Sequence, residues 1–244
     1  MYFNNIHILY YTLFAILGGV IGQIVDYCSK IFLKEKRILS KKEIKEYLNI
    51  ATPNYILIFI MAIVYEALLY KFGFKNYLDL IRFGLLMPML SIAFIVDYKI
   101  QIIPNRLNLT MFELGLLFTF IFANQNINIG KDLLLGMLAG GGIFLAITLI
   151  GGLIAGKEAM GLGDVKLMGA LGLYFGVSKT LLISVLAFLI GAIVSIILIA
   201  IKKNKQGAYI PFGPFIVAAS IITIFIPFEI LFTILMEIFS LGLY

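Results

Sequence analysis

Two aspartates in strongly apolar surroundings are the residues of this chain best suited to chemistry. Asp164 ends the stretch Gly161-Leu162-Gly163-Asp164, and Asp97 ends the apolar run Phe94-Ile95-Val96. An ionisable side chain is costly to place inside a lipid bilayer, so each aspartate is by default a functional residue with a partner to be found. The best partner for each is the other.

A pair of neighbouring carboxyl groups has a defined chemistry. Because two close carboxylates do not both ionise easily, they share one proton. The ionised group can take a proton from water, and the protonated group can donate to a peptide carbonyl as the tetrahedral intermediate forms. This chemistry hydrolyses a peptide without a covalent intermediate. We expect no metal, because a single histidine, His7, and a single cysteine, Cys28, exclude a multi-histidine site and a zinc ribbon.

The two glycines before Asp164 predict an unusual helix end. Gly161 and Gly163 remove side chains, so backbone can approach backbone or substrate, and they allow φ values that other residues avoid. Such a helix end is tolerated in a bilayer only where it lines protein or water. The alternatives are simpler: Asp164 could cap the helix that follows, and Asp97 could pair with Lys99 or Arg106 at the membrane surface.

Composition places the elements that carry these residues in lipid. Of 244 residues, 62% are hydrophobic and only 13% are charged, with a mean hydropathy of +1.06. A soluble domain has about a quarter charged residues. We therefore predict an all-α fold, a polytopic integral membrane helical bundle with about eight transmembrane helices. The apolar runs cover residues 6–28, 54–72, 79–97, 106–124, 132–156, 163–177, 179–201 and 208–240. The last run contains Pro227, which predicts a kink or re-entry there.

Charge predicts how the chain is oriented. The net charge is +6, and of 19 Lys and Arg residues the predicted spans put fourteen on the side of the basic segment 29–50. An excess of Lys and Arg marks the cytoplasmic side, so we expect 29–50 to be a short cytoplasmic loop and both termini to be extracytoplasmic. Asp97 and Asp164 then fall at the same, cytoplasmic face. The positive charge is explained by topology and contact with membrane lipid, and nucleic-acid binding is not expected.

Three motifs together resemble a known family. The run from Glu158 to Leu167, which contains Asp164, is similar to the signature of the type IV prepilin peptidases, membrane aspartic proteases with a GxGD motif. Asp97 followed by Ile103-Pro104-Asn105 resembles the family's first aspartate motif, and Ile210-Pro211-Phe212-Gly213-Pro214-Phe215 resembles its later turn and helix start. The clear likeness covers residues 85–220. We accordingly predict a single membrane domain over 1–244, with a peptidase core at 79–220.

The resemblance implies cleavage of the basic leader of type IV prepilins or pseudopilins at the cytoplasmic face of the bacterial inner membrane. The cut would precede a hydrophobic pilin helix. Asp97 and Asp164 carry over as the catalytic pair, and Gly161, Gly163, Pro104 and Asn105 as motif residues. Glu158 could attract the basic leader, and Lys166 could stabilise a carboxylate or bind an acidic residue of the pilin. Alternatively, Glu158 and Lys166 could each be a charged side chain that extends to the membrane–water interface.

The chain departs from the family's longer members in one respect. Those have two CxxC pairs in a cytoplasmic loop and also methylate the new pilin terminus with S-adenosylmethionine. This chain has no CxxC, so S-adenosylmethionine is expected only if methylation is retained. Other candidate functions are a presenilin-like or archaeal preflagellin-type GxGD protease, and a proton-coupled transporter. The order Asp97-Tyr98 and the lack of a Pro-Ala-Leu element disfavour the presenilin type.

Overall fold

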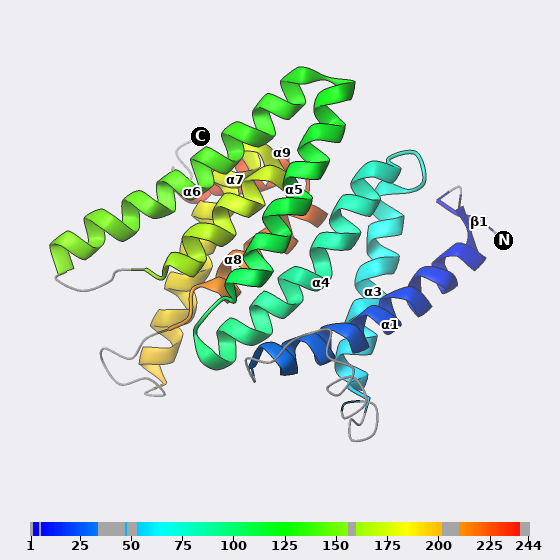
Figure 1. Cartoon of the computed structure of the whole chain (residues 1–244), viewed down its shortest axis with the longest axis horizontal. Helices are drawn as coiled ribbons and strands as arrows, with labels where there is room; N and C mark the ends of the chain where they lie inside the picture. Colours follow the sequence, from blue (N-terminus) through cyan, green and yellow to red (C-terminus); the bar gives the residue numbers. More distant parts are fainter. Residues whose placement is uncertain are drawn as a thin grey trace. The chain divides into compact units, whose positions relative to one another are not determined.

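The computed structural model describes residues 2–4, 6–33, 47, 53–155, 160–201 and 210–239, and within these ranges the chain is almost entirely helical (Figure 1). Six of the helices are long and apolar enough to cross a membrane. The prediction of an all-α, polytopic membrane protein is therefore confirmed. A two-stranded hairpin, β1 (Tyr2–Phe3) and β2 (Ile6–His7), precedes the first helix. The chain divides into two compact units, 1–96 and 97–244.

The first unit holds α1 (Ile8–Leu33), α3 (Tyr55–Phe72) and most of α4 (Tyr77–Ile100). The α1 and α3 helices pack closely because Gly18 and Gly22 have no side chain: a Cβ at either position would overlap the backbone of α3. Asn54 caps the start of α3, and Gly73, with φ of 56°, ends it. Most of the predicted loop 29–50 lies outside the described residues, but residues 29–33 still belong to α1.

A buried carboxylate joins the ends of α1 and α3. Asp26 accepts hydrogen bonds from Lys30 Nζ at 2.6 Å, Tyr47 Oη at 2.6 Å and Asn54 Nδ2 at 3.0 Å. Burial and the bond to Asp26 together raise the pKa of the Tyr47 hydroxyl, so that it stays protonated and keeps donating. Three donors compensate the burial of this one charge.

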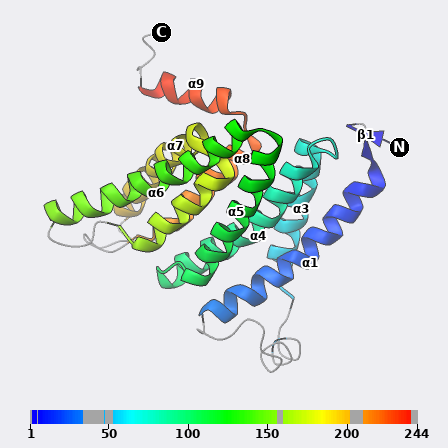
Figure 2. The same cartoon turned by 45° about the horizontal axis from the view of Figure 1, so that its top comes forward.

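The second unit starts in the last turn of α4 and continues with α5 (Asn105–Gln125), α6 (Ile127–Ala155), α7 (Leu162–Ala200), α8 (Gly213–Phe225) and α9 (Phe228–Phe239). The α5, α6 and α7 helices lie side by side (Figure 1). Figure 2 shows α9 standing apart from the other helices of this unit. The single-domain prediction and its core at 79–220 stay predictions.

The long α7 consists of two rods that meet at Gly176, where φ is 72° and ψ is 179°. Along α6, Gly136 lies against Gly172 and Gly176, and Gly140 lies against Met168 and Thr180. Along the first rod, the α6 residues in contact run backwards, from Gly140 to Gly136, and along the second rod they run forwards, from Gly136 to Gly140. The two rods therefore run in opposite directions beside α6. The predicted sixth and seventh spans, 163–177 and 179–201, correspond to these rods.

The last predicted span, 208–240, is interrupted at Pro227, as the sequence predicted. It divides into α8 and α9, of 13 and 12 residues. Each is shorter than the roughly 20 residues that a spanning helix needs. Pro227 explains the break, because proline has no N–H to continue the ladder, and its carbonyl accepts from Leu231 to begin α9 instead.

Candidate active site

Asp97 lies in the last turn of α4, where the helix ends because Gln101 adopts a positive φ of 58°. The aspartate is buried, and its Oδ2 accepts a hydrogen bond from the backbone N–H of Gly213 at 3.0 Å. Gly213 is the first residue of α8. The N-terminus of a helix carries partial positive charge, so this contact stabilises negative charge on Asp97.

Asp164 lies in the first turn of α7, whose N-cap is Gly161. Its backbone N–H donates to the Gly161 carbonyl at 3.0 Å, which starts the helix. The Asp164 side chain is buried, yet its carboxyl group accepts no hydrogen bond from the described residues. The two aspartates therefore have different surroundings: one is fixed by a backbone donor, and the other has its oxygens available.

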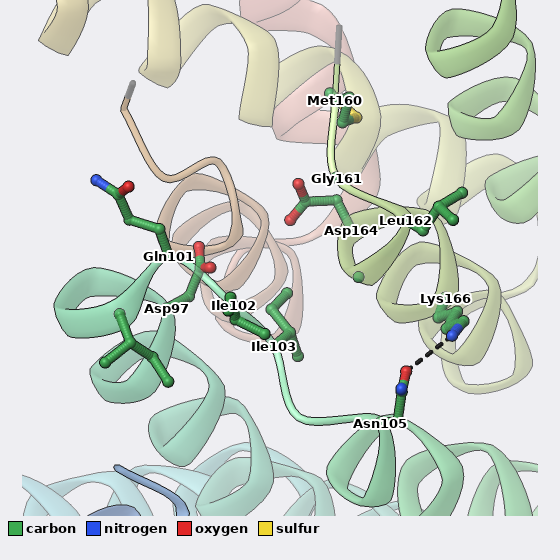
Figure 3. A pocket seen from close by; sticks show the side chains of 12 residues that line it. Asp97, Gln101, Ile102, Ile103, Asn105, Met160, Gly161, Leu162, Asp164 and Lys166 are labelled. Atoms are coloured by element: carbon green, nitrogen blue, oxygen red, sulfur yellow. Dashed lines mark hydrogen bonds between the residues drawn. The ribbon is translucent and has the colours of Figure 1, made fainter. Parts of the chain in front are cut away.

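Both aspartates line one pocket of about 650 Å³. In Figure 3 the two carboxyl groups lie on facing walls of this pocket, Asp97 on the side of Gln101 and Asp164 on the side of the chain that leads into α7. The structure thus brings together the two residues singled out from the sequence. Their surroundings do not match the alternative in which Asp97 pairs with Lys99 or Arg106.

Ile103 holds the three chain segments of the site together. It is buried, and its side chain lies against Gly163 at the start of α7 and Gly213 at the start of α8. A Cβ on Gly163 would come within 3.3 Å of the Ile103 Cβ, and one on Gly213 would come within 2.6 Å of Asp97 Oδ2. Glycine is therefore needed at Gly213 for space.

The expected unusual backbone at Gly161 is not present. Gly161 has φ of −70° and ψ of 139°, a conformation open to any residue. Among the described glycines, positive φ occurs at Gly73 and Gly176 and not at Gly161 or Gly163. The role of Gly163 is close approach, as expected, and Gly161 lines the pocket beside Asp164.

Of the remaining motif residues, Asn105 and Lys166 line the pocket. Pro104 is the N-cap of α5, and its carbonyl accepts from Leu107 and Asn108. Asn105 begins α5 and accepts a hydrogen bond at 2.7 Å from Lys166 Nζ (Figure 3). Lys166 thus binds a neutral amide and neither aspartate. Glu158 lies outside the described residues.

Two site residues were not among the candidates chosen from the sequence. Gly213 was noted only as part of a turn, whereas it supplies the donor to Asp97. Asn108 is buried, and its Nδ2 donates to the Gly163 carbonyl at 3.1 Å, which ties α5 to the start of α7. The sequence did offer a signal for Asn108, because it is a polar residue within an apolar run, one helical turn after Pro104.

Within the described ranges, no group of three or more His, Cys, Asp or Glu residues could hold a metal ion. The polar side chains that line the pocket are those of the two aspartates, Gln101, Asn105 and Lys166. Such a set can activate water and protonate a carbonyl oxygen. The assignment of catalytic roles to Asp97 and Asp164 stays a prediction.

Residues 84–196 match the type IV leader peptidase family. Similar curated proteins are the prepilin leader peptidase/N-methyltransferases of Aeromonas hydrophila (33% identical over 124 residues), Pseudomonas aeruginosa (32% over 127) and Legionella pneumophila (33% over 141). The first two matches cover 51% of this chain and 42% of the relative, and the third covers 56% and 46%.

The matched part thus spans less than half the length of these relatives. No solved structure shows significant similarity to the chain. The matched stretch contains both aspartates and the Asn105–Lys166 contact, and it ends before Gly213. Residues 84–196 of the chain are thus similar to the type IV leader peptidase family.

Proposed function

We propose that this protein is a membrane aspartic endopeptidase of the type IV leader peptidase family that removes the basic leader from type IV prepilins or pseudopilins. The observation that carries the proposal is that Asp97 and Asp164 line one pocket at the ends of two apolar helices. The names of the relatives, prepilin leader peptidases, support the substrate class.

The different surroundings of the two carboxyl groups suggest their roles. Asp97, which accepts from Gly213 N–H at the start of α8, is the ionised group and takes a proton from the attacking water. Asp164 is the protonated group and donates to the carbonyl oxygen as water oxygen bonds to the carbonyl carbon. When the C–N bond breaks, the proton on Asp97 goes to the leaving amine. Asp164 regains its proton as the carboxylic acid product forms.

The location follows from charge. The excess of Lys and Arg around the segment 29–50 supports a cytoplasmic position for the pocket, in the bacterial inner membrane, with both termini on the other side. A leader that carries positive charge stays on the cytoplasmic side for the same reason. The bond to be cut is then near the pocket while the apolar part of the substrate remains in lipid.

The methyltransferase part of the relatives' names describes those longer proteins. For this chain, methylation with S-adenosylmethionine stays an open prediction. Proteolysis as proposed needs only the two aspartates and water. The mass of the cleaved product decides the question, since a methylated terminus is heavier by one methylene group.

The test is leader cleavage of a prepilin in membranes that contain the wild-type protein, Asp97→Asn or Asp164→Asn, with mass spectrometry of the product. We expect the wild type to cut and both variants to be inactive while folded. Glu113→Gln is the matched control, because Glu113 is an exposed carboxylate of α5 outside the pocket lining. Cleavage that survives either aspartate substitution would show that the pair is structural. A proton-coupled carrier would instead lose pH dependence of transport.

A further inference from the structure

A second pocket lies between α5 and α7, next to the one that holds the aspartates. It measures about 400 Å³, and the surface that its residues expose in it is almost entirely apolar. Its residues come from the N-terminal part of each helix: Asn105, Asn108, Leu109, Phe112, Lys166, Gly169 and Ala170. Gly169 and Ala170 add little bulk on the α7 side, which leaves the space open.

The two pockets share one hydrogen-bonded pair. Asn105 and Lys166 line both, and the 2.7 Å bond between them spans the boundary. In Figure 3 this pair lies on one side of the two aspartates and Gln101 lies on the other. A peptide that crosses the aspartates therefore meets the apolar pocket on the Lys166 side.

Asn108, which lines this pocket, has a buried acceptor for which the described residues supply no donor. Asn108 is 3% exposed, and its Nδ2 is engaged with the Gly163 carbonyl. Its Oδ1 is buried and has no hydrogen-bond partner among the described residues. The accessible area of this oxygen is below 1 Å², so a ligand N–H would reach it only after the amide turns toward the pocket, and it would then pair an unsatisfied acceptor.

We propose that this pocket binds the apolar residues that follow the scissile bond, with Asn108 Oδ1 accepting a backbone N–H of that segment. The inference rests on the proposed leader peptidase function. A peptide bond must leave the helical conformation to be cut, so nearby substrate amides lose their intrahelical partners and need acceptors in the bilayer. Asn108 Oδ1 supplies such an acceptor for a substrate amide near the scissile bond.

The polarity of the two pockets fixes the direction of the substrate. The two pockets share Asn105 and Lys166, but the aspartate pocket adds two carboxyl groups and Gln101, whereas the second pocket adds the apolar Leu109, Phe112 and Ala170. A substrate with a basic leader followed by an apolar helix has the same division. The leader therefore lies toward Gln101, and the apolar helix enters between α5 and α7 beside Leu109, which is 55% exposed.

Cysteine cross-linking tests this direction. Cys28 is the only cysteine, so Cys28→Ser gives a clean background. Leu109→Cys then marks the pocket, and Leu117→Cys is the matched control, because it lies two turns further along α5 with a similar exposure of 53%. The substrate is a prepilin with one cysteine, placed either just after the scissile bond or in the leader. Asp97→Asn prevents turnover during cross-linking.

We expect the Leu109→Cys variant to cross-link several-fold more to the position after the scissile bond than to the leader, and several-fold more than the Leu117→Cys variant does. Preferred cross-linking to the leader, or equal yields for the two enzyme variants, would overturn the inference. Each cysteine variant with intact aspartates is also assayed for cleavage. Normal cleavage with the wrong cross-link refutes only the pocket assignment, whereas no cleavage by the wild type refutes the proposed function itself.

Discussion

At the scale of single residues, the site depends on backbone groups as much as on the aspartates. Asp97 and Asp164 could be predicted from the sequence because a carboxylate in an apolar run is rare and costly. Gly213 could not be assigned its role, because a backbone N–H at a helix start leaves no side-chain signal. Asn108 is similar: its contact with the Gly163 carbonyl joins residues that are 55 positions apart.

Gly213→Ala should impair cleavage strongly without unfolding the protein. The added Cβ would lie 2.6 Å from Asp97 Oδ2, so the carboxylate must move away from its donor. A displacement of about 1 Å at a reacting group can cost about 100-fold in rate, and we expect a loss of that order in the cleavage assay. Gly142→Ala is the control, since a Cβ there meets no other atom within 4 Å. Equal activity of the two variants would contradict the role of Gly213.

Asn108→Ala should lower both stability and activity. It removes the bond to the Gly163 carbonyl, and a buried group left without its partner costs about 1–3 kcal/mol. Thermal unfolding in detergent measures the first effect, and the cleavage rate measures the second. Thr110→Ala on the same helix is the control, because Thr110 is exposed and bonds only to the Arg106 carbonyl of its own turn. An unfolding temperature that falls no further in Asn108→Ala than in Thr110→Ala would argue against the contact.

At the scale of helices, α7 reverses at Gly176, and its first rod carries Asp164. The first rod of α7 packs on α5, where Tyr174 Oη donates to the Met111 carbonyl at 2.9 Å. The second rod begins with Val177, whose N–H donates to Asp132 Oδ1 at 3.3 Å. Apolar runs in the sequence predicted two separate spans here. The turn between them could not be predicted, because it depends on Asp132 of α6.

Gly176→Ala should destabilise the protein. At φ of 72° and ψ of 179° the backbone is in a region open almost only to glycine, and a side chain there costs on the order of 1–3 kcal/mol. The new Cβ would also overlap the Asp132 carboxylate. We expect a lower unfolding temperature in detergent, whereas Gly141→Ala, whose Cβ makes only ordinary contacts, should be neutral. An unchanged unfolding temperature for Gly176→Ala would mean that the chain does not reverse there.

At the scale of the whole molecule, the sequence predicted the fold class and the membrane character well. Both follow from the composition and from the length of the apolar runs, which are set by the lipid bilayer and not by tertiary contacts. The sequence also predicted the interruption at Pro227, but not that the last predicted span divides there into two separate short helices. Orientation rests on charge alone, and it decides which side of the membrane the pocket faces.

Labelling of single cysteines tests that orientation. In a Cys28→Ser background, Gln101→Cys lies at the aspartate pocket and Asn126→Cys lies at the opposite end of α5, and both positions are exposed. A membrane-impermeant maleimide added to intact cells should label the Asn126→Cys variant and not the Gln101→Cys variant. The thiol of the Gln101→Cys variant should react only after the inner face is opened. The reverse pattern would place the pocket on the extracytoplasmic side.

The most direct test of the central claim is a double-mutant comparison of Asp97→Asn, Asp164→Asn and the two together, by the rate of prepilin cleavage. Residues that act as one unit show strongly non-additive losses. If the two aspartates share a proton and act on one water, each single variant should lose as much activity as the double variant. Losses that multiply in the double variant, or cleavage that persists in either single variant, would contradict the two-aspartate mechanism.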